Sequence, residues 1–252
     1  MGRTWSTIID HILLRENMAH RRILRVSVSP RYAAVLIEGD ILGVAYSYAF
    51  EEFCQPLMVE GEELGEAIVS LLESDCTVSR AIAQAAANAV GQYELREAIA
   101  HGRTLSWSEL FGREYERGAR SVLFVGEIKK VPRIALESGF EVKIVDRNPR
   151  SPGTLPDYYY YKYAPKSDLI VVTGSAFARP DIDSLLDTAK PDAIITVVGP
   201  SASLPPKVLR RIGVKYQASI LIKEPVMVER LVRNNQGHRT FKPYVEDFIL
   251  EI

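Results

Sequence analysis

Four apolar stretches in the second half of the chain each end in small or polar residues. In chain order these residues are Gly126 and Glu127; Asp146 and Asn148; Thr173, Gly174 and Ser175; and Gly199, Pro200 and Ser201. Backbone N–H groups and hydroxyl groups donate hydrogen bonds, and carboxylates accept them. If these strand ends meet, they predict a site for a small polar or anionic molecule. Each glycine or serine alone could serve a turn or a helix cap, so the prediction rests on the set.

Asp146 adds a nucleotide hypothesis. It lies twenty positions after Gly126, where dinucleotide-binding folds place the carboxylate that binds ribose hydroxyls. The loop from Gly126 to Lys130 lacks the G-x-G-x-x-G pattern, which argues against a standard NAD site. An enzyme of the methyltransferase or dehydrogenase type with a nucleoside cofactor is therefore the alternative function. Asp146 could instead cap a turn with Asn148 and Pro149.

Sequence motifs for a metal site or a hydrolytic active site are weaker than those for the strand-end site. The four histidines are dispersed and the two cysteines stand alone, so neither a helical nor a C-x-x-C metal motif is present. Glu38 and Asp40 could join Glu127 and Asp146 around a metal ion only if the fold brings these distant carboxylates together. No G-x-S-x-G pattern supports a hydrolase. The sequence leaves open whether the protein is an enzyme.

Two further features could contribute to the site. Asn88 interrupts an alanine-rich helical stretch, and it could face a crevice between domains or tie the helix to a loop. The aromatic run from Tyr158 to Tyr161 could form a strand or loop edge that covers the crevice, or it could pack between domains.

The second half of the chain alternates apolar stretches with helical spacing. The predicted strands are Ser121–Gly126, Glu141–Asp146, Asp168–Gly174, Ala193–Gly199 and Tyr216–Ile222. The predicted helices are Val131–Ser138, Asp181–Ala189, Pro205–Ile212 and Glu224–Asn234. Strands without polar alternation are buried on both faces, which indicates a parallel sheet covered by helices. Ligands bind such Rossmann-like sheets at the carboxyl ends of the strands.

The first half has a different order. An amphipathic helix over Trp5–Met18 precedes three short strands at Ile23–Ser29, Tyr32–Glu38 and Ile41–Tyr48, and helices follow at Glu62–Leu72 and Thr77–Ala100. Short breaks between the strands predict an antiparallel meander with helices packed on it. The stretch from Gly102 to Gly118 loses its periodicity. We therefore expect an α+β domain at 1–104 and a Rossmann-like α/β domain at 105–252, an α/β fold class overall.

The composition of the chain argues against nucleic acid and membranes as binding partners. The 31 basic and 32 acidic side chains nearly cancel, so no overall field attracts nucleic acid or an anionic membrane. No apolar run approaches the ~20 residues of a membrane span. Cys54 and Cys76 are too few for a disulfide framework, and together these features favour a cytoplasmic protein. A homodimer is the default expectation for its assembly.

Taken together, four motifs resemble those of the heavy-metal-chelation family. They are Ala85–Val90, Asp146–Pro149, Thr173–Ser175 and Gly199–Ser201. The resemblance implies an N-terminal domain like that of enolase joined to a Rossmann-like domain, with Asn88 meeting the strand-end loops in an active site between them. The segment from Ala176 to Pro180 departs from the Asn-Gly-Thr-like stretch of relatives.

The leading hypothesis is a protein that binds a small molecule between its domains. The ligand would be a metal ion, a metal-chelating molecule, or a pterin-like or nucleoside compound held by Asp146, the glycine loops and Asn88. A third possibility is an interaction module whose tyrosine run and arginine-rich helices contact another protein.

Overall fold

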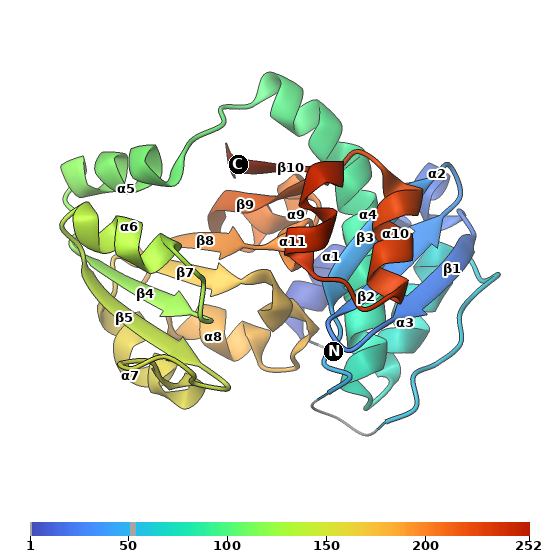
Figure 1. Ribbon diagram of the computed structural model, residues 1–252, viewed down its shortest axis with the longest axis horizontal. Helices are drawn as coiled ribbons and strands as arrows, with labels where there is room; N and C mark the ends of the chain where they lie inside the picture. Colours follow the sequence, from blue (N-terminus) through green and yellow to red (C-terminus); the bar gives the residue numbers. More distant parts are fainter. Residues whose placement is uncertain (1, 51–53) are drawn as a thin grey trace.

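The computed structural model describes residues 2–50 and 54–252 and contains two sheets. One has three strands in the order β1-β2-β3, and the other has seven strands in the order β10-β9-β8-β7-β4-β5-β6. In Figure 1 the arrowheads of β4, β5 and β7 point toward the half of the molecule that contains the smaller sheet. The carboxyl ends of the parallel strands therefore face the junction between the two sheets.

The smaller sheet is the predicted antiparallel meander. Its strands are β1 (Ile23–Val28), β2 (Tyr32–Ile37) and β3 (Ile41–Tyr46). The helices of this half are α1 (Arg3–Leu13), α2 (Glu16–Ala19), α3 (Leu64–Glu73) and α4 (Thr77–His101). The single opening helix predicted over Trp5–Met18 is in fact two helices, because the chain leaves the helix after Leu14.

The larger sheet confirms the predicted α/β fold class. Its strands are β4 (Ser121–Val125), β5 (Glu141–Asp146), β6 (Leu155–Pro156), β7 (Leu169–Thr173), β8 (Ile194–Val198), β9 (Val214–Ile222) and β10 (Val245–Glu251). All neighbouring pairs are parallel except β9 and β10. The helices are α5 (Trp107–Glu116), α6 (Val131–Glu137), α7 (Tyr160–Tyr163), α8 (Ile182–Thr188), α9 (Pro206–Arg211), α10 (Pro225–Arg233) and α11 (His238–Phe241).

Two sequence expectations for this half were wrong. The stretch from Gly102 to Gly118 is not aperiodic but contains α5, which begins with a capping box between Ser106 and Glu109. The tyrosine run is not a strand or loop edge but lies in a 3-10 turn and α7, where the rings of neighbouring residues stack, Tyr158 on Tyr159 and Tyr160 on Tyr161. Local helical hydrogen bonds outweighed the β preference of tyrosine in this segment.

The two halves of the chain share their packing. Helix α10, near the C-terminus, covers the face of the smaller sheet opposite α4, and Val228 and Val232 pack there with Ala34 and Leu36. The buried carboxylate of Glu229 on α10 accepts a hydrogen bond from the Ser27 hydroxyl at 2.6 Å. The division at residues 104 and 105 stays a prediction, and across it the halves form one continuous core.

Helix α4 lies unusually close to its neighbours because its inner face is built from small residues. A Cβ atom added to Gly43 on β3 would lie 1.9 Å from the carbonyl oxygen of Ala85, and one added to Gly91 on α4 would lie 1.7 Å from that of Ser203. Glycine is therefore needed at both positions for this approach. The alanine-rich helix thus packs against β3 on one side and against the loop after β8 on the other.

The two cysteines are not isolated, which corrects the sequence expectation. Cys54 and Cys76 form a disulfide across a sequence separation of 22, with their Cα atoms 5.6 Å apart. Cys76 immediately precedes α4, and the segment that carries Cys54 folds back against it. Spacing alone could not show this, because the connection depends on the path of the intervening chain.

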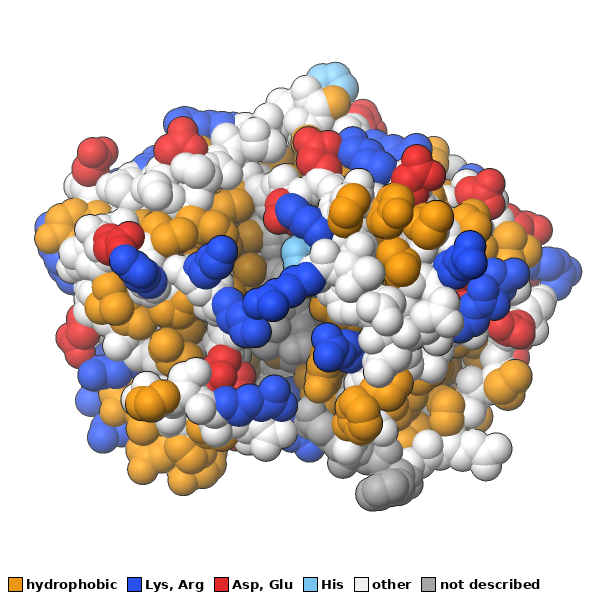
Figure 2. Space-filling view, in the orientation of Figure 1, with side chains coloured by type: hydrophobic (Ala, Val, Ile, Leu, Met, Phe, Trp, Pro, Cys, Tyr) orange, Lys and Arg blue, Asp and Glu red, His pale blue; other side chains and the backbone are white. Residues whose placement is uncertain are grey.

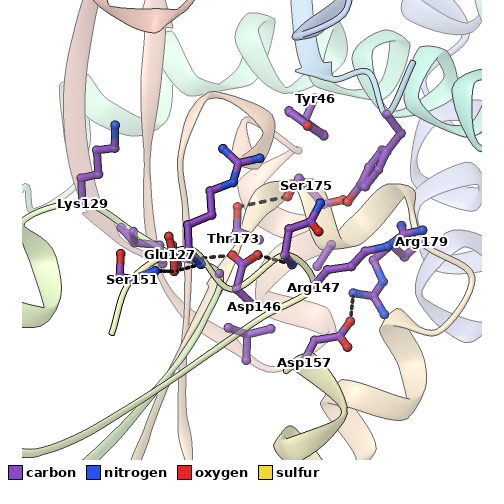
Figure 3. Close-up of a pocket in the computed structure, with 17 residues that line it drawn as sticks. Tyr46, Glu127, Lys129, Asp146, Arg147, Ser151, Asp157, Thr173, Ser175 and Arg179 are labelled. Carbon is purple, nitrogen blue, oxygen red and sulfur yellow. Dashed lines mark hydrogen bonds and ion pairs between the residues drawn. The ribbon is translucent and has the colours of Figure 1, made fainter. Parts of the chain in front are cut away.

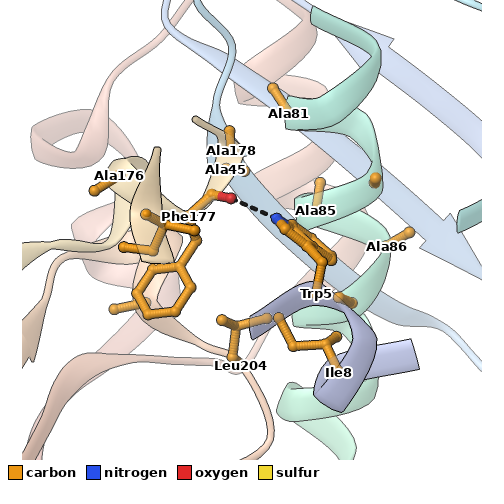
Figure 4. Packing of buried hydrophobic residues seen from close by; sticks show 14 of the residues in the cluster. Trp5, Ile8, Ala45, Ala81, Ala85, Ala86, Ala176, Phe177, Ala178 and Leu204 are labelled. Carbon is orange, nitrogen blue, oxygen red and sulfur yellow. Dashed lines mark hydrogen bonds between the residues drawn. The ribbon is translucent and has the colours of Figure 1, made fainter. Parts of the chain in front are cut away.

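Trp5 on α1 connects the first helix to the larger sheet (Figure 4). Its side chain is 1% exposed, and its indole N–H donates to the carbonyl oxygen of Phe177 at 2.7 Å. Phe177 belongs to the 3-10 segment η3 (Gly174–Ala178) that follows β7. The start of the chain therefore supports a loop at the carboxyl edge of the larger sheet.

Candidate functional site

A pocket with a volume of about 470 Å³ opens at the carboxyl ends of β4, β5 and β7, beneath the end of β3 (Figure 3). It contains six of the predicted site residues: Gly126, Glu127, Asp146, Asn148, Thr173 and Ser175. Its other lining residues are Tyr46, Tyr48, Val125, Ile128, Lys129, Arg147, Arg150, Ser151, Asp157, Ala176 and Arg179. The strand ends after the first three predicted strands thus meet, as their order in a parallel sheet requires.

Asp146 organises the two loops on either side of it. One carboxylate oxygen accepts a hydrogen bond from the backbone N–H of Glu127, and the other accepts one from the N–H of Asn148, both at 2.7 Å. The bond to Asn148 is the turn cap considered from the sequence. The bond to Glu127 fixes the loop after β4 to the end of β5. Asp146 therefore holds together the two loops that line this side of the pocket.

The carboxylate of Glu127 is similarly engaged. Its Oε1 atom accepts hydrogen bonds from the backbone N–H groups of Arg150 and Ser151, both at 2.8 Å. These bonds, the one from Arg150 foremost, lower the pKa of Glu127 from its ordinary value. The ionised side chain thus holds the loop after β5 against the loop after β4.

We expect this link to weaken in acid. A lowered pKa in the folded state stabilises the loop above the ordinary carboxyl pKa of about 4.3, and the contribution is lost as the pH falls through the lowered value. Hydrogen exchange of the Arg150 and Ser151 amides should therefore lose protection below this range, while the amide of Leu123 inside β4 stays protected. Equal protection of the two loop amides at neutral and acidic pH would contradict the prediction.

Arg179 forms a cluster with two carboxylates at one side of the pocket. Its guanidinium lies 2.7 Å from Asp157 and 2.6 Å from Asp181. Burial opposes ionisation, but the hydrogen bonds to Asp181 and Asp157 outweigh it and raise the pKa of Arg179. The guanidinium is thus a fixed, fully charged wall of the pocket with two anionic partners.

Two other cations have no such partner. The Lys129 ammonium and the Arg150 guanidinium form no hydrogen bond or ion pair with the residues that the structure describes, and both side chains are exposed at the pocket. In Figure 2 several Lys and Arg side chains gather around the hollow at the centre of the molecule. The cationic residues that line the pocket, Lys129, Arg147, Arg150 and Arg179, outnumber its carboxylates, Glu127, Asp146 and Asp157, so its lining carries net positive charge.

Aromatic rings and hydroxyl groups form the opposite wall. The rings of Tyr46 and Tyr48 meet edge to face with their centroids 4.9 Å apart, and the Tyr48 hydroxyl donates to the carbonyl oxygen of Ser175 at 2.8 Å. The hydroxyls of Thr173 and Ser175 lie 3.2 Å apart. The guanidinium of Arg147 lies 5.8 Å from the centre of the Tyr48 ring, within the range of a cation–π contact.

The remaining predicted residues do not line this pocket. Asn88, Gly174 and Ser201 are buried beneath its wall, while Gly199 and Pro200 line a neighbouring cavity. The strand-end motifs thus converge in space but divide between two cavities and the packing behind them.

Asn88 belongs to a row of three amides that follow one face of α4. Gln84 donates to the backbone carbonyl oxygens of Gly174 and Ser201 at 2.6 and 2.7 Å. Asn88 donates to the same oxygen of Ser201 at 3.0 Å, and Gln92 exchanges two bonds with the backbone of β9. Because residues four positions apart share a helix face, this row holds the loops after β7 and β8 in place. Asn88 therefore supports the pocket wall from behind.

Sequence reasoning missed several pocket residues. Arg147 and Arg150 flank the Asp146 motif, and Arg179 lies in the segment that departs from the pattern of relatives. Tyr46 and Tyr48 end a strand of the other half, so only the fold could bring them to the pocket. The charged residues next to the strand ends could have been predicted as pocket residues from the sequence. No sequence pattern indicated that Tyr46 and Tyr48 would line the pocket.

The described residues do not fit a heavy-metal centre built from protein side chains. Among residues 2–50 and 54–252, no group of three or more His, Cys, Asp or Glu side chains could hold a metal ion. The carboxylates of Glu127 and Asp146 are occupied by N–H donors, and both cysteines are in the disulfide. Glu38 and Asp40 do not line the pocket with Glu127 and Asp146.

Within the described part of the chain, we also find no helix suited in length and hydropathy to crossing a bilayer.

Comparison with known proteins identifies relatives over nearly the whole chain. An uncharacterised protein of Methanocaldococcus jannaschii is 26% identical over 219 residues, which cover 83% of this chain and 82% of the relative. A crystal structure of a DUF364-family protein of unknown function from Pyrococcus horikoshii has a TM-score of 0.84 at 24% identity, with 99% of this chain and 100% of the other covered. Another, from Desulfitobacterium hafniense, has a TM-score of 0.80 at 18% identity and covers 98% and 97% of the two chains. The two structures share the fold.

Two family models match the sequence, and both carry the description "Putative heavy-metal chelation". The DUF4213 model matches residues 12–91, and the DUF364 model matches residues 111–251. The first match covers the smaller sheet with α3 and most of α4, and the second covers the larger sheet from within α5 to β10. The chain belongs to this heavy-metal-chelation family.

Proposed function

We propose that the protein binds a small oxyanion-bearing molecule in the pocket at the carboxyl ends of β4, β5 and β7. The observation that carries the proposal is the charge of the pocket. Lys129 and Arg150 lack partners among the described residues, while the neighbouring carboxylates accept backbone hydrogen bonds. Cations of this kind recognise phosphate and carboxylate groups, and the hydroxyls of Thr173 and Ser175 supply further hydrogen bonds.

The family description fits this proposal if the metal arrives with the ligand. An organic anion that chelates a metal supplies its own donor atoms, and the pocket then needs to recognise only the remaining anionic groups. Side chains of the described residues provide no metal-binding cluster. We therefore infer that a heavy metal enters the pocket as part of a chelate, a step that requires no protein ligand.

Isothermal titration calorimetry with inorganic phosphate and citrate, each with and without Zn²⁺, tests the proposal. We expect binding of at least one anion, and a loss of about tenfold in affinity for each of Lys129→Ala and Arg150→Ala, because a hydrogen bond to a charged group contributes about 1.5–3 kcal/mol. Arg133→Ala is the matched control, since this exposed arginine on α6 pairs with Glu137 outside the pocket. Zn²⁺ alone should not bind stoichiometrically.

Two results would overturn the proposal. If none of the anions binds the wild-type protein at millimolar concentration, the pocket is not an oxyanion site. If Zn²⁺ binds alone and Arg150→Ala leaves anion affinity unchanged, the metal is held by the protein and the charged pocket has another role.

A nucleoside-cofactor enzyme is the second candidate. The candidate is supported by the position of Asp146, which ends β5 and lines the pocket together with Gly126. Its two oxygens already accept backbone hydrogen bonds, which leaves them less available to ribose hydroxyls. S-adenosylmethionine and NAD belong in the same titrations, and micromolar affinity for either, lost in Asp146→Ala, would favour this candidate.

A further inference from the structure

A second cavity adjoins the pocket along the same edge of the larger sheet. Its volume is about 540 Å³, and it shares the lining residues Ile128 and Lys129 with the first pocket. The loop after β8, with Gly199 and Pro200, forms part of its border. The two spaces thus lie on either side of the short loop that follows β4.

The wall of this second cavity is mainly apolar. Its apolar lining residues are Leu105, Trp107, Ile128, Val131, Val198, Pro200, Ala218, Ile220, Phe248 and Ile249. Several lie on β8, β9 and β10, and Trp107 and Val131 come from α5 and α6. A ring or hydrocarbon group in this cavity would contact water only at the cavity opening. Burial of apolar surface in this way is favourable.

The polar residues of the second cavity offer little charge to an anion. Burial lowers the pKa of His238 against the opposing effect of Asp247, so the imidazole is neutral at neutral pH. Asp247 lies 3.4 Å from that ring and is also paired with Lys242. Lys129 is the cation of this cavity, and it stands at the border with the first pocket. Positive charge is therefore concentrated at one end of the combined space.

We propose that the two cavities are subsites for one amphipathic ligand, with its oxyanion head in the first pocket and a flat apolar group in the second. This inference rests on the proposed function, because it takes the first pocket as the head site. The shared residues Ile128 and Lys129 show that the two cavities adjoin at the loop after β4. The change from charged to apolar lining determines which end of the ligand occupies which cavity. Gly199 and Pro200, predicted as site residues, then contact the apolar group.

Calorimetry with inorganic phosphate, phenyl phosphate and 1-naphthyl phosphate tests the inference. These probes keep one head and enlarge the apolar group, so we expect affinity to rise along the series, with 1-naphthyl phosphate about tenfold or more tighter than inorganic phosphate. Ala218→Leu should fill the second cavity and remove this gain while inorganic phosphate still binds. Arg150→Ala should weaken all three probes by a similar factor.

A measurement on the wild-type protein avoids dependence on the folding of Ala218→Leu. In methyl NMR spectra, 1-naphthyl phosphate should shift the signals of Ala218 and Ile249, and inorganic phosphate should not. Equal affinity for the three probes, or unshifted Ala218 and Ile249 methyl signals, would overturn the two-subsite inference and leave the oxyanion pocket intact. Failure of every probe to bind would instead overturn the proposed function itself.

Discussion

Replacing Trp5 by alanine should lower the free energy of unfolding by about 3–5 kcal/mol, the usual cost of removing a large buried aromatic side chain. The indole is 1% exposed and fills the space between α1, α4 and the segment after β7 (Figure 4). Its loss also leaves the carbonyl oxygen of Phe177 without its hydrogen bond. Urea denaturation followed by circular dichroism measures the effect.

Trp5→Phe is the matched control, because it keeps one aromatic ring in the core and removes the indole N–H group together with part of the ring volume. We expect this variant to lose about 1–3 kcal/mol, the cost of an unsatisfied buried acceptor with a small cavity. If Trp5→Ala unfolds at the same urea concentration as the wild-type protein, α1 does not contribute to the shared core. The order wild type, Trp5→Phe, Trp5→Ala is the expected result.

Replacing Gly91 by alanine should destabilise the protein by about 1–3 kcal/mol, the usual cost of overpacking a core. The added methyl group would lie 1.7 Å from the carbonyl oxygen of Ser203, so either α4 or the loop after β8 must move. The same substitution normally stabilises a helix by about 1 kcal/mol, which makes the expected sign opposite to the intrinsic preference.

Gly112→Ala is the matched control, because it is the same substitution in another helix. Gly112 lies within α5, and nothing lies within 4 Å of the position that a Cβ atom would take. We expect this variant to gain about 0.5–1 kcal/mol. The thermal midpoints of the two variants should therefore move in opposite directions, and a stabilised Gly91→Ala protein would show that α4 does not approach the loop so closely.

Most helices and strands could be predicted because the sequence patterns that indicate them are local. Continuous apolar stretches identified β4, β5, β7 and β8, and alanine-rich spacing identified α4 almost to its ends. The antiparallel strand β10 was missed, since Val245–Glu251 mixes charged residues with apolar ones at the edge of the sheet. Its position depends on pairing with β9, which no local pattern encodes.

The candidate site could be predicted only in part for the same reason. Gly126, Asp146 and Thr173 come together because parallel strands align their carboxyl ends. Tyr46 reaches the pocket from the other sheet, and the side chain of Asn88 turns into the core. Both outcomes follow from how α4 packs between the sheets, which depends on contacts across more than forty positions of the chain.

The packing of α10 on the smaller sheet has a consequence for biosynthesis. Residues such as Ala34 and Leu36 leave the ribosome well before the helix that covers them, Pro225–Arg233, is synthesised. At translation rates of about 5–20 residues per second, that sheet face waits on the order of ten seconds or longer for its cover. A nascent chain halted before α10 should therefore expose an apolar surface that attracts chaperones, and synthesis of α10 should release them.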